Sequence, residues 1–133
     1  MAPSPRHLLV VDDEPHIGLL LRPLLERMGF RLSMARTLSA ARVVLADRAT
    51  PLDGMLLDLH LPDGSGLTLL AELRGDPATR TLPIMVVTAE GEEHILNEVT
   101  ALDALLLTKP FSPTKLMRRL VELFGGGPPE EAA

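Results

Sequence analysis

The chain has 133 residues, of which 46% are apolar, and a formal net charge of −5. This length and apolar content predict a single compact domain and argue against a disordered chain. The acidic balance, with no long basic run, argues against binding to a nucleic-acid backbone. The chain contains no cysteine, which excludes disulfides and thiolate metal sites.

No segment of the sequence predicts a membrane anchor or a secretion signal. Residues 1–7 lack the charged-then-apolar pattern of a signal peptide, and the apolar run that follows them is far too short. No other stretch approaches the roughly 20 apolar residues that a membrane-spanning helix requires. We therefore expect a cytoplasmic chain that makes no contact with membranes.

The chain begins with a predicted strand and a predicted helix. Leu8–Val11 is wholly apolar and of strand length, which is typical of a parallel strand covered on both faces. Apolar residues then recur at three-and-four spacing over residues 17–28, and Gly29 supplies a stop. Because Pro23 lies inside this helical pattern, we expect a bend or a lost hydrogen bond there.

The middle of the chain predicts two further strands, each followed by a helix. The segment Arg31–Ala35 alternates polar and apolar residues, which suits an edge strand, and apolar residues at 41–45 mark the helix after it. Met55–Leu57 has the pattern of another buried strand. The leucines between residues 67 and 73 mark a third helix, which is expected to end at Gly75.

The last part of the chain predicts two more strands and two more helices. Ile84–Val87 and Leu105–Leu107 are apolar runs of strand length. Between them, a short helix around Glu92–Val99 begins with acidic residues that suit a helix N-terminus. For the final helix, Ser112 is the predicted N-cap and Pro113 the first helical residue.

A strand followed by a helix, repeated five times, predicts an α/β fold. Right-handed crossovers turn this order into a doubly wound, five-stranded parallel sheet with five helices on its two faces. We expect the domain to span residues 6–124. Residues 1–5 are expected to be disordered, and so is the Gly- and Pro-rich segment 125–133, a tail or linker that begins where Gly125 ends the last helix.

Polar side chains follow four of the predicted strands. Asp12 and Asp13 come directly after the first apolar run, and Asp58 comes after the third strand. Thr88 and Lys109 follow the fourth and fifth strands. In a doubly wound sheet, ligands bind outside the carboxyl ends of the strands, so these five side chains are predicted to form one site.

The chemistry of these five side chains is coherent. Three carboxylates held close together repel one another and need a cation, and oxygen ligands without His or Cys side chains favour Mg²⁺. A carboxylate also serves as a nucleophile in phosphoryl transfer, forming an aspartyl phosphate whose charge a metal and a lysine would offset. A threonine hydroxyl is suited to detect the new phosphate through a hydrogen bond.

Four blocks of the sequence together resemble the receiver domains of two-component response regulators, and in particular those that are similar to chemotaxis regulators. The resemblance covers roughly residues 6–124, and the joint occurrence of the blocks is highly specific. The blocks are Leu8–Pro15, Leu56–Gly66, Val86–Ala89 and Leu107–Phe111.

This resemblance implies a flavodoxin-like fold with strand order 2-1-3-4-5. It also implies that Asp58 accepts a phosphoryl group from a sensor histidine kinase or a histidine phosphotransfer protein, and that this Mg²⁺-dependent step switches a partner-binding surface. The sequence does not identify the downstream partner. The chain would not be an ordinary enzyme, because it would catalyse only its own phosphoryl transfer and autodephosphorylation.

The same resemblance implies which residues hold the metal. Asp13 and Asp58 would bind Mg²⁺ directly, and Asp12 would act largely through water. The backbone carbonyl of His60 would complete the protein ligands. All three carboxylates are therefore assigned to the metal site.

The resemblance assigns the switch and the phosphate contact as well. Thr88 would be the switch hydroxyl and Lys109 the contact to the phosphate, with a cis bond between Lys109 and Pro110. Receivers usually have an aromatic residue three positions before the lysine, but here that residue is Leu106. We interpret Leu106 as a buried strand residue and expect a switch without an aromatic rotamer change.

The surface around the fourth predicted helix departs further from the family. Leu102–Asp103 replaces the common Gly-Ala pair, and Ala104–Leu105 replaces the acidic pair with which one subfamily dimerises, so we do not predict that dimer. His60 and Glu90 flank the phosphate site at positions where receivers control access of the attacking water. The alternative is that both are ordinary solvated loop residues.

Two other functions remain as alternatives. An aspartate-nucleophile phosphatase also uses strand-end carboxylates and Mg²⁺, but it needs a second aspartate two residues after the nucleophile, where this chain has His60. Such phosphatases usually need a cap domain too, which a chain of this length does not supply. A degenerate receiver that acts only as a binding module is disfavoured, because all five site side chains are present.

Overall fold

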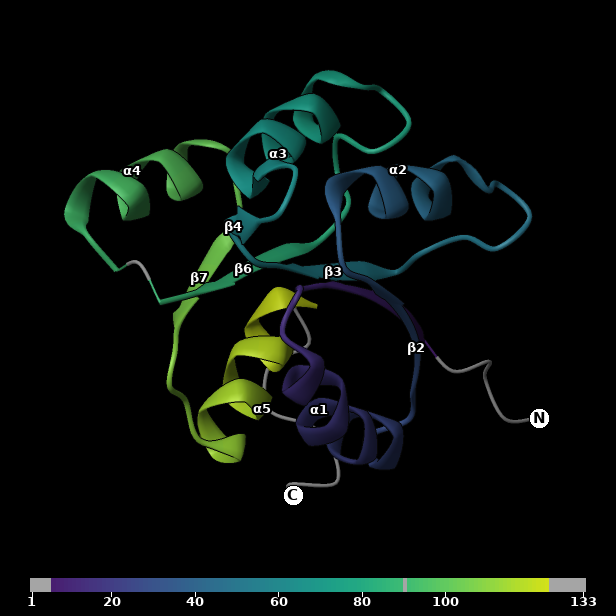
Figure 1. Cartoon of the computed structure of the whole chain (residues 1–133), viewed down its shortest axis with the longest axis vertical. Coiled ribbons are helices and arrows are strands. Elements are labelled where there is room, and N and C mark those ends of the chain that lie inside the picture. The colour runs from purple at the N-terminus through teal and green to yellow at the C-terminus, as the bar shows by residue number, and fades with distance from the viewer. Residues whose placement is uncertain (1–5, 90, 125–133) are drawn as a thin grey trace.

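The computed structural model describes residues 6–89 and 91–124, in which strands alternate with helices (Figure 1). The strands are β1 (Arg6–Val11), β2 (Phe30–Ala35), β3 (Gly54–Leu57), β4 (His60–Leu61), β5 (Gly64–Ser65), β6 (Ile84–Thr88) and β7 (Leu105–Thr108). The helices are α1 (Pro15–Arg27), α2 (Leu38–Ala46), α3 (Gly66–Gly75), α4 (Glu93–Ala101) and α5 (Pro113–Leu123).

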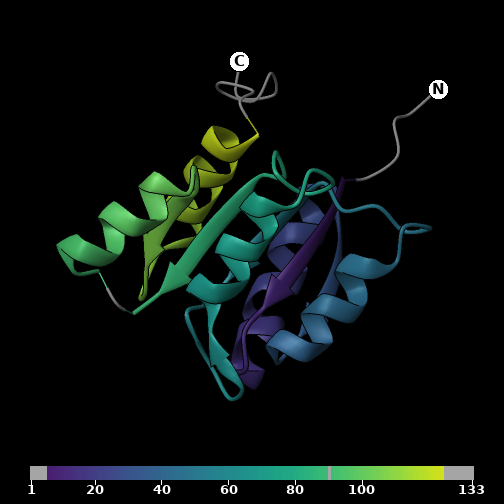
Figure 2. The same ribbon diagram turned by 90° about the horizontal axis from the view of Figure 1, so that it is seen from above.

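Within the described residues, five parallel strands form one sheet in the order β2-β1-β3-β6-β7. This order is the predicted 2-1-3-4-5, with β2 at one edge, so the predicted fold class is confirmed. The sequence did not predict β4 and β5, which form a separate antiparallel hairpin. Figure 2 shows this hairpin projecting at the edge of the sheet toward which the strand arrows point.

Two hydrophobic clusters cover the two faces of the sheet. Helices α2, α3 and α4 lie on one face, and α1 and α5 lie on the other (Figure 1). Successive residues of a strand point to opposite faces. In β1, Leu9 packs in the α2–α3–α4 cluster and Leu8 in the α1–α5 cluster, and neither side chain is exposed. The nearly continuous apolar runs in the sequence arise because both faces of the sheet are covered.

Several predicted boundaries agree with the structure, and one placement was wrong. The Ser112 hydroxyl caps α5 by accepting a hydrogen bond from the Lys115 N–H at 3.1 Å, and Gly29 follows α1 with φ of 92°. Helix α1 continues through Pro23. The first strand was predicted to begin at Leu8, but β1 begins at Arg6 and includes His7, whose Nε2 contacts the Ser33 hydroxyl at 2.7 Å. Residues 1–5, Glu90 and residues 125–133, including the predicted stop at Gly125, lie outside the described residues.

Arg74, in the last turn of α3, holds the turn that leads into β7. Its Nε donates to the Leu102 carbonyl at 2.7 Å and its Nη2 donates to the Asp103 carbonyl at 3.0 Å. Its Nη1 donates to the carbonyls of Thr79 and Arg80 at 3.4 and 3.1 Å. Asp103 has φ of 55°, in the left-handed region that aspartate tolerates better than most residues. One guanidinium therefore ties α3 to the α4–β7 turn.

Replacing Arg74 with methionine is expected to lower the free energy of unfolding by about 2 kcal/mol. The reason is that hydrogen bonds from a charged donor contribute about 1.5–3 kcal/mol, and the carbonyls of the half-buried residues Leu102 and Thr79 would lose that donor. Urea denaturation followed by far-UV circular dichroism measures the change. Arg80→Met is the matched control, because Arg80 is exposed and only its carbonyl is used. Equal stability of the two variants would contradict the role given to Arg74.

Candidate functional site

The carboxyl ends of four strands bring the five predicted side chains to one edge of the sheet. Asp12 and Asp13 follow β1, Asp58 follows β3, Thr88 ends β6 and Lys109 follows β7. Asp12, Asp58 and Thr88 are buried, with exposed fractions of 4%, 7% and 0%, whereas Asp13 is half-buried. The sequence therefore predicted correctly which residues would lie at this edge.

Backbone hydrogen bonds continue the sheet pairing into the site. The Asp12 N–H donates to the carbonyl of the last β2 residue at 3.0 Å, and the Asp58 N–H donates to the Val11 carbonyl at 2.9 Å. The Lys109 N–H donates to the Thr88 carbonyl at 2.8 Å. Because Asp12, Asp58 and Lys109 are each bonded to a neighbouring strand, the rigid sheet fixes where their side chains begin. The predicted cis bond between Lys109 and Pro110 is present.

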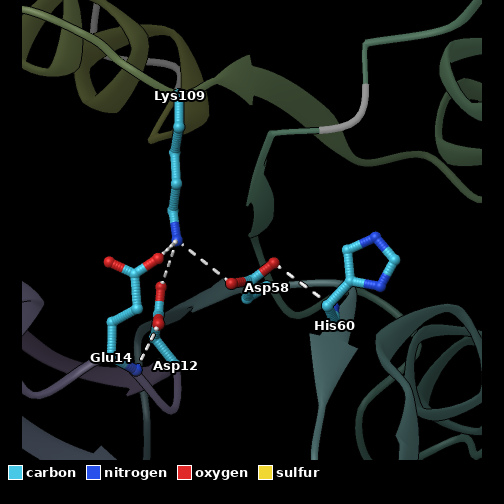
Figure 3. A network of polar contacts seen from close by, with 5 residues as sticks. All are labelled: Asp12, Glu14, Asp58, His60 and Lys109. Atoms are coloured by element: carbon cyan, nitrogen blue, oxygen red, sulfur yellow. Dashed lines mark hydrogen bonds and ion pairs between the residues drawn. The ribbon is translucent and has the colours of Figure 1, made fainter.

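Lys109 bridges two of the carboxylates. Its Nζ donates to Asp12 Oδ2 at 2.8 Å and to Asp58 Oδ2 at 3.0 Å, and it lies 3.6 Å from Glu14 Oε1 (Figure 3). Burial opposes the charged form of Lys109, but the hydrogen bonds to the two aspartates outweigh burial and raise the pKa of the ammonium above its ordinary value. Lys109 is therefore fully charged at neutral pH.

The environment of Asp12 disfavours the charged form of its carboxyl group. Burial raises the pKa of its carboxyl above the ordinary value, even though hydrogen bonds from Lys109 and from the Glu14 N–H, the latter at 2.9 Å, act in the opposite direction. The nearby Asp58 carboxylate adds repulsion that also raises this pKa. The single positive charge of Lys109 thus leaves the carboxylates incompletely compensated, and a further cation would stabilise them.

The donor set suits a hard divalent cation. One carboxylate oxygen from each of Asp12, Asp13 and Asp58 lies within 4.8 Å of the others. The cluster contains only oxygen ligands, and such a donor set favours the binding of Mg²⁺ over Zn²⁺ or copper. The half-buried position of Asp13 leaves one side of the cluster open to water, which Mg²⁺ usually retains as part of its coordination shell. These residues therefore fit Mg²⁺.

The backbone around Asp58 is tightly packed against the start of α3. The His60 N–H donates to Asp58 Oδ1 at 3.3 Å, and the Gly66 N–H donates to the Leu59 carbonyl at 2.9 Å. A Cβ at Gly66 would lie 2.2 Å from the Asp58 carbonyl oxygen, so only glycine fits there. Neither Gly66 nor Glu14 was predicted to have a role in the site, although both lie within the motif blocks.

Leu106 differs in part from its predicted environment. It lies in β7 in register with Val86 and packs against the α2–α3–α4 cluster, but it is half-buried, not buried. Its carbonyl accepts a hydrogen bond from Arg119 Nη2 of α5 at 2.7 Å. The side chain that replaces the usual aromatic residue is therefore part of the core boundary, and its backbone is tied to α5.

Comparison with known proteins decides the family. The family model for the response regulator receiver domain matches residues 8–121. The chain belongs to this family. Among the residues that the structure describes, no helix of the receiver combines the length and the apolar character needed to cross a membrane.

Sequence relatives of the receiver include transcriptional regulators. The phosphate regulon transcriptional regulatory protein PhoB of Pseudomonas aeruginosa is 38% identical over 116 residues, which cover 85% of this chain and 49% of that protein. The KDP operon transcriptional regulatory protein KdpE of Escherichia coli is 38% identical over 117 residues, which cover 86% of this chain and 50% of that protein. The chain thus spans about half the length of these relatives.

Solved receiver structures share the fold. A putative response regulator from Chloroflexus aurantiacus is 30% identical, with a TM-score of 0.82 and coverage of 91% of this chain and 98% of that chain. The non-phosphorylated HemR receiver domain from Leptospira biflexa is 28% identical, with a TM-score of 0.82 and coverage of 94% and 98%. The β2-β1-β3-β6-β7 order is therefore that of a flavodoxin-like receiver.

Proposed function

We propose that Asp58 accepts a phosphoryl group from a sensor histidine kinase or a histidine phosphotransfer protein, in a reaction that depends on Mg²⁺. The observation that carries this proposal is the cluster of three carboxylates, two of which contact the ammonium of the half-buried Lys109. In this arrangement Asp13 and Asp58 bind Mg²⁺ directly, Asp12 acts largely through water, and the His60 carbonyl completes the protein ligands. Family membership supports these roles.

The proposed transfer places Asp58 as the nucleophile. A carboxylate oxygen of Asp58 attacks the phosphorus of a phosphohistidine, the P–N bond breaks, and its electron pair goes to the imidazole of the donor. Bound Mg²⁺ supplies positive charge that offsets the charge on the phosphoryl oxygens. Lys109, which now donates to Asp58 Oδ2, instead donates to a phosphoryl oxygen after transfer. Burial of Asp58 limits the access of competing water.

The proposed output depends on Thr88. Its side chain is fully buried at the end of β6, next to β7 in the sheet. The hydroxyl turns toward the new phosphate and donates a hydrogen bond to it, which changes the packing between β6 and the α4–β7 surface. In this chain the change passes to the half-buried Leu106 and not to an aromatic ring. The proposed readout is altered binding of a protein partner, in a chain that acts as a switch and performs only its own phosphorylation and dephosphorylation.

Intact-mass measurement tests this function directly. The chain is incubated with acetyl phosphate, with and without Mg²⁺, alongside Asp58→Asn and the control variant Asp47→Asn, which changes an exposed aspartate in the α2–β3 loop. We expect wild type and Asp47→Asn to gain one phosphoryl group only when Mg²⁺ is present, and Asp58→Asn to gain none. No adduct on wild type would overturn the proposal, and repeated turnover of unrelated phosphate esters would favour a phosphatase.

A further inference from the structure

The β4–β5 hairpin carries at its tip a carboxylate that has no role in the site described above. Asp63 accepts three hydrogen bonds from the start of α2, which precedes it by 24 or 25 residues. Its Oδ1 accepts from the Leu38 N–H at 2.8 Å. Its Oδ2 accepts from the Ser39 N–H at 3.0 Å and from the Ser39 hydroxyl at 3.1 Å. The hairpin is therefore attached to α2 through one side chain.

Helix α2 has a local cap as well, so Asp63 is an additional partner of this N-terminus. The Thr37 hydroxyl accepts from the Ala40 N–H at 3.0 Å, and the Thr37 carbonyl accepts from the Ala41 N–H at 3.0 Å. The first N–H groups of a helix have no partner within the helix, and here the Thr37 hydroxyl satisfies that of Ala40 while Asp63 satisfies those of Leu38 and Ser39. The carboxylate also complements the positive end of the helix dipole.

The Asp63 carboxylate is charged under ordinary conditions. Hydrogen bonds from the backbone N–H groups of Leu38 and Ser39 lower the pKa of this carboxyl below its usual value, against a smaller effect of burial. The neighbouring Gly64, with φ of 146°, also lies against α2, because a Cβ there would be 3.0 Å from Leu38 Cδ1. Two adjacent residues of the hairpin tip thus fix its position against α2.

The other end of the hairpin meets the phosphoacceptor. His60, the first residue of β4, donates its N–H to Asp58 Oδ1 at 3.3 Å, and its carbonyl is the proposed metal ligand (Figure 3). The hairpin contains only two residue pairs, His60 with Ser65 and Leu61 with Gly64, and among the described residues it pairs with no other strand. Since so short a hairpin is not stable by itself, its position depends on contacts with the rest of the domain, which are those at its two ends and the packing of Leu61 against the α2–α3–α4 cluster.

We propose that Asp63 is a positioning residue for the metal and phosphoryl site: by tying the hairpin to the N-terminus of α2, it holds the backbone of His60 beside Asp58. This inference rests on the proposed function, because the His60 carbonyl matters only if Mg²⁺ binds there. Residues that orient metal ligands without touching the metal affect its affinity. The α2 helix thereby acts as a rigid support for a loop that has little structure of its own.

Titration of Mg²⁺ into the unphosphorylated chain, followed by isothermal calorimetry, tests the inference without relying on phosphorylation. We expect Asp63→Ala to weaken Mg²⁺ binding roughly tenfold, the lower end of the range for groups that orient metal ligands. The matched control is Thr37→Ala, which removes a cap from the same helix but leaves the hairpin contact intact. This control is expected to bind Mg²⁺ as wild type does.

The outcomes separate this inference from the proposed function. If wild type binds no Mg²⁺, the proposed function fails and the inference fails with it. If wild type binds Mg²⁺ and Asp63→Ala binds it equally tightly, or if Thr37→Ala loses as much affinity as Asp63→Ala, only the positioning role is overturned. Should Asp63→Ala not fold, Asp63→Asn replaces it, since the amide keeps an acceptor for the Leu38 N–H, and a loss of affinity smaller than tenfold but measurable is then expected.

Discussion

Replacing Gly66 with alanine is expected to lower the free energy of unfolding by about 3 kcal/mol, the upper end for overpacking. The added Cβ would lie 2.2 Å from the Asp58 carbonyl oxygen and 3.1 Å from the Leu59 Cα. These atoms belong to the backbone, so no side-chain rotation relieves the contact. Relieving this contact requires the backbone of the phosphoacceptor Asp58 to move, so phosphorylation should also slow about tenfold or more.

Gly75→Ala is the matched control for this prediction. Gly75 ends the same helix, and a Cβ there would meet no atom within 4 Å. Alanine at such a position restricts the unfolded chain, and the free energy of unfolding should rise by about 0.5 kcal/mol. Urea denaturation gives both stabilities, and intact mass after timed exposure to acetyl phosphate gives both rates. Wild-type behaviour of Gly66→Ala in both measurements would show that the close approach to Asp58 is wrong.

The edge of the sheet that bears the site could be predicted because two local signals coincide there. Each buried strand is a short apolar run, and a polar residue directly after it must lie at the carboxyl end of that strand. In a parallel sheet these ends share one edge, so Asp12, Asp58 and Lys109 were expected together. No long-range information was needed for this step, because the covered sheet itself dictates the pattern.

The β4–β5 hairpin could not be predicted in the same way. Its strands have two residues each, too few to show any alternation. In the sequence, Asp63 followed by Gly64 is typical of an ordinary turn. The hydrogen bonds that Asp63 accepts from α2 join residues far apart in the chain, and no local pattern marks the partner. The contact between the β4–β5 hairpin and α2 can therefore be identified only from the three-dimensional structure.

Strand length was underestimated for a related reason. Pairing with β2 carries β1 back to Arg6, opposite Phe30, and includes His7, opposite Arg31. A polar side chain before an apolar run marks the end of the run but not the end of the backbone pairing. The buried His7 is tolerated in β1 because its Nε2 has a hydrogen-bond partner, the Ser33 hydroxyl of the adjacent strand. Apolar patterning thus reports burial, and hydrogen-bond partners decide where a strand begins.

Replacing Lys109 with methionine is expected to destabilise the metal-free chain by about 3 kcal/mol, because it leaves the charges of Asp12 and Asp58 buried without their partner. The lysine pKa is raised from 10.5, so its contribution is complete below pH 10.5 and is lost only as the pH rises through the higher value in the folded chain. At neutral pH the full effect should therefore be measured. Lys115→Met, which removes an exposed lysine of α5, should change stability by less than about 0.5 kcal/mol.

Mg²⁺ is expected to reduce the difference between Lys109→Met and wild type. The ammonium lies between Asp12 Oδ2 and Asp58 Oδ2, where its charge repels an incoming cation, so its removal should tighten Mg²⁺ binding. A ligand at 100 times its dissociation constant stabilises a folded chain by about 2.7 kcal/mol, and the variant should gain more than wild type at any given Mg²⁺ concentration. Urea denaturation with and without Mg²⁺ measures both gains. If Mg²⁺ instead raises the free energy of unfolding of wild type more than that of Lys109→Met, then Lys109 assists metal binding. In that case the metal does not replace the positive charge of Lys109 beside the carboxylates.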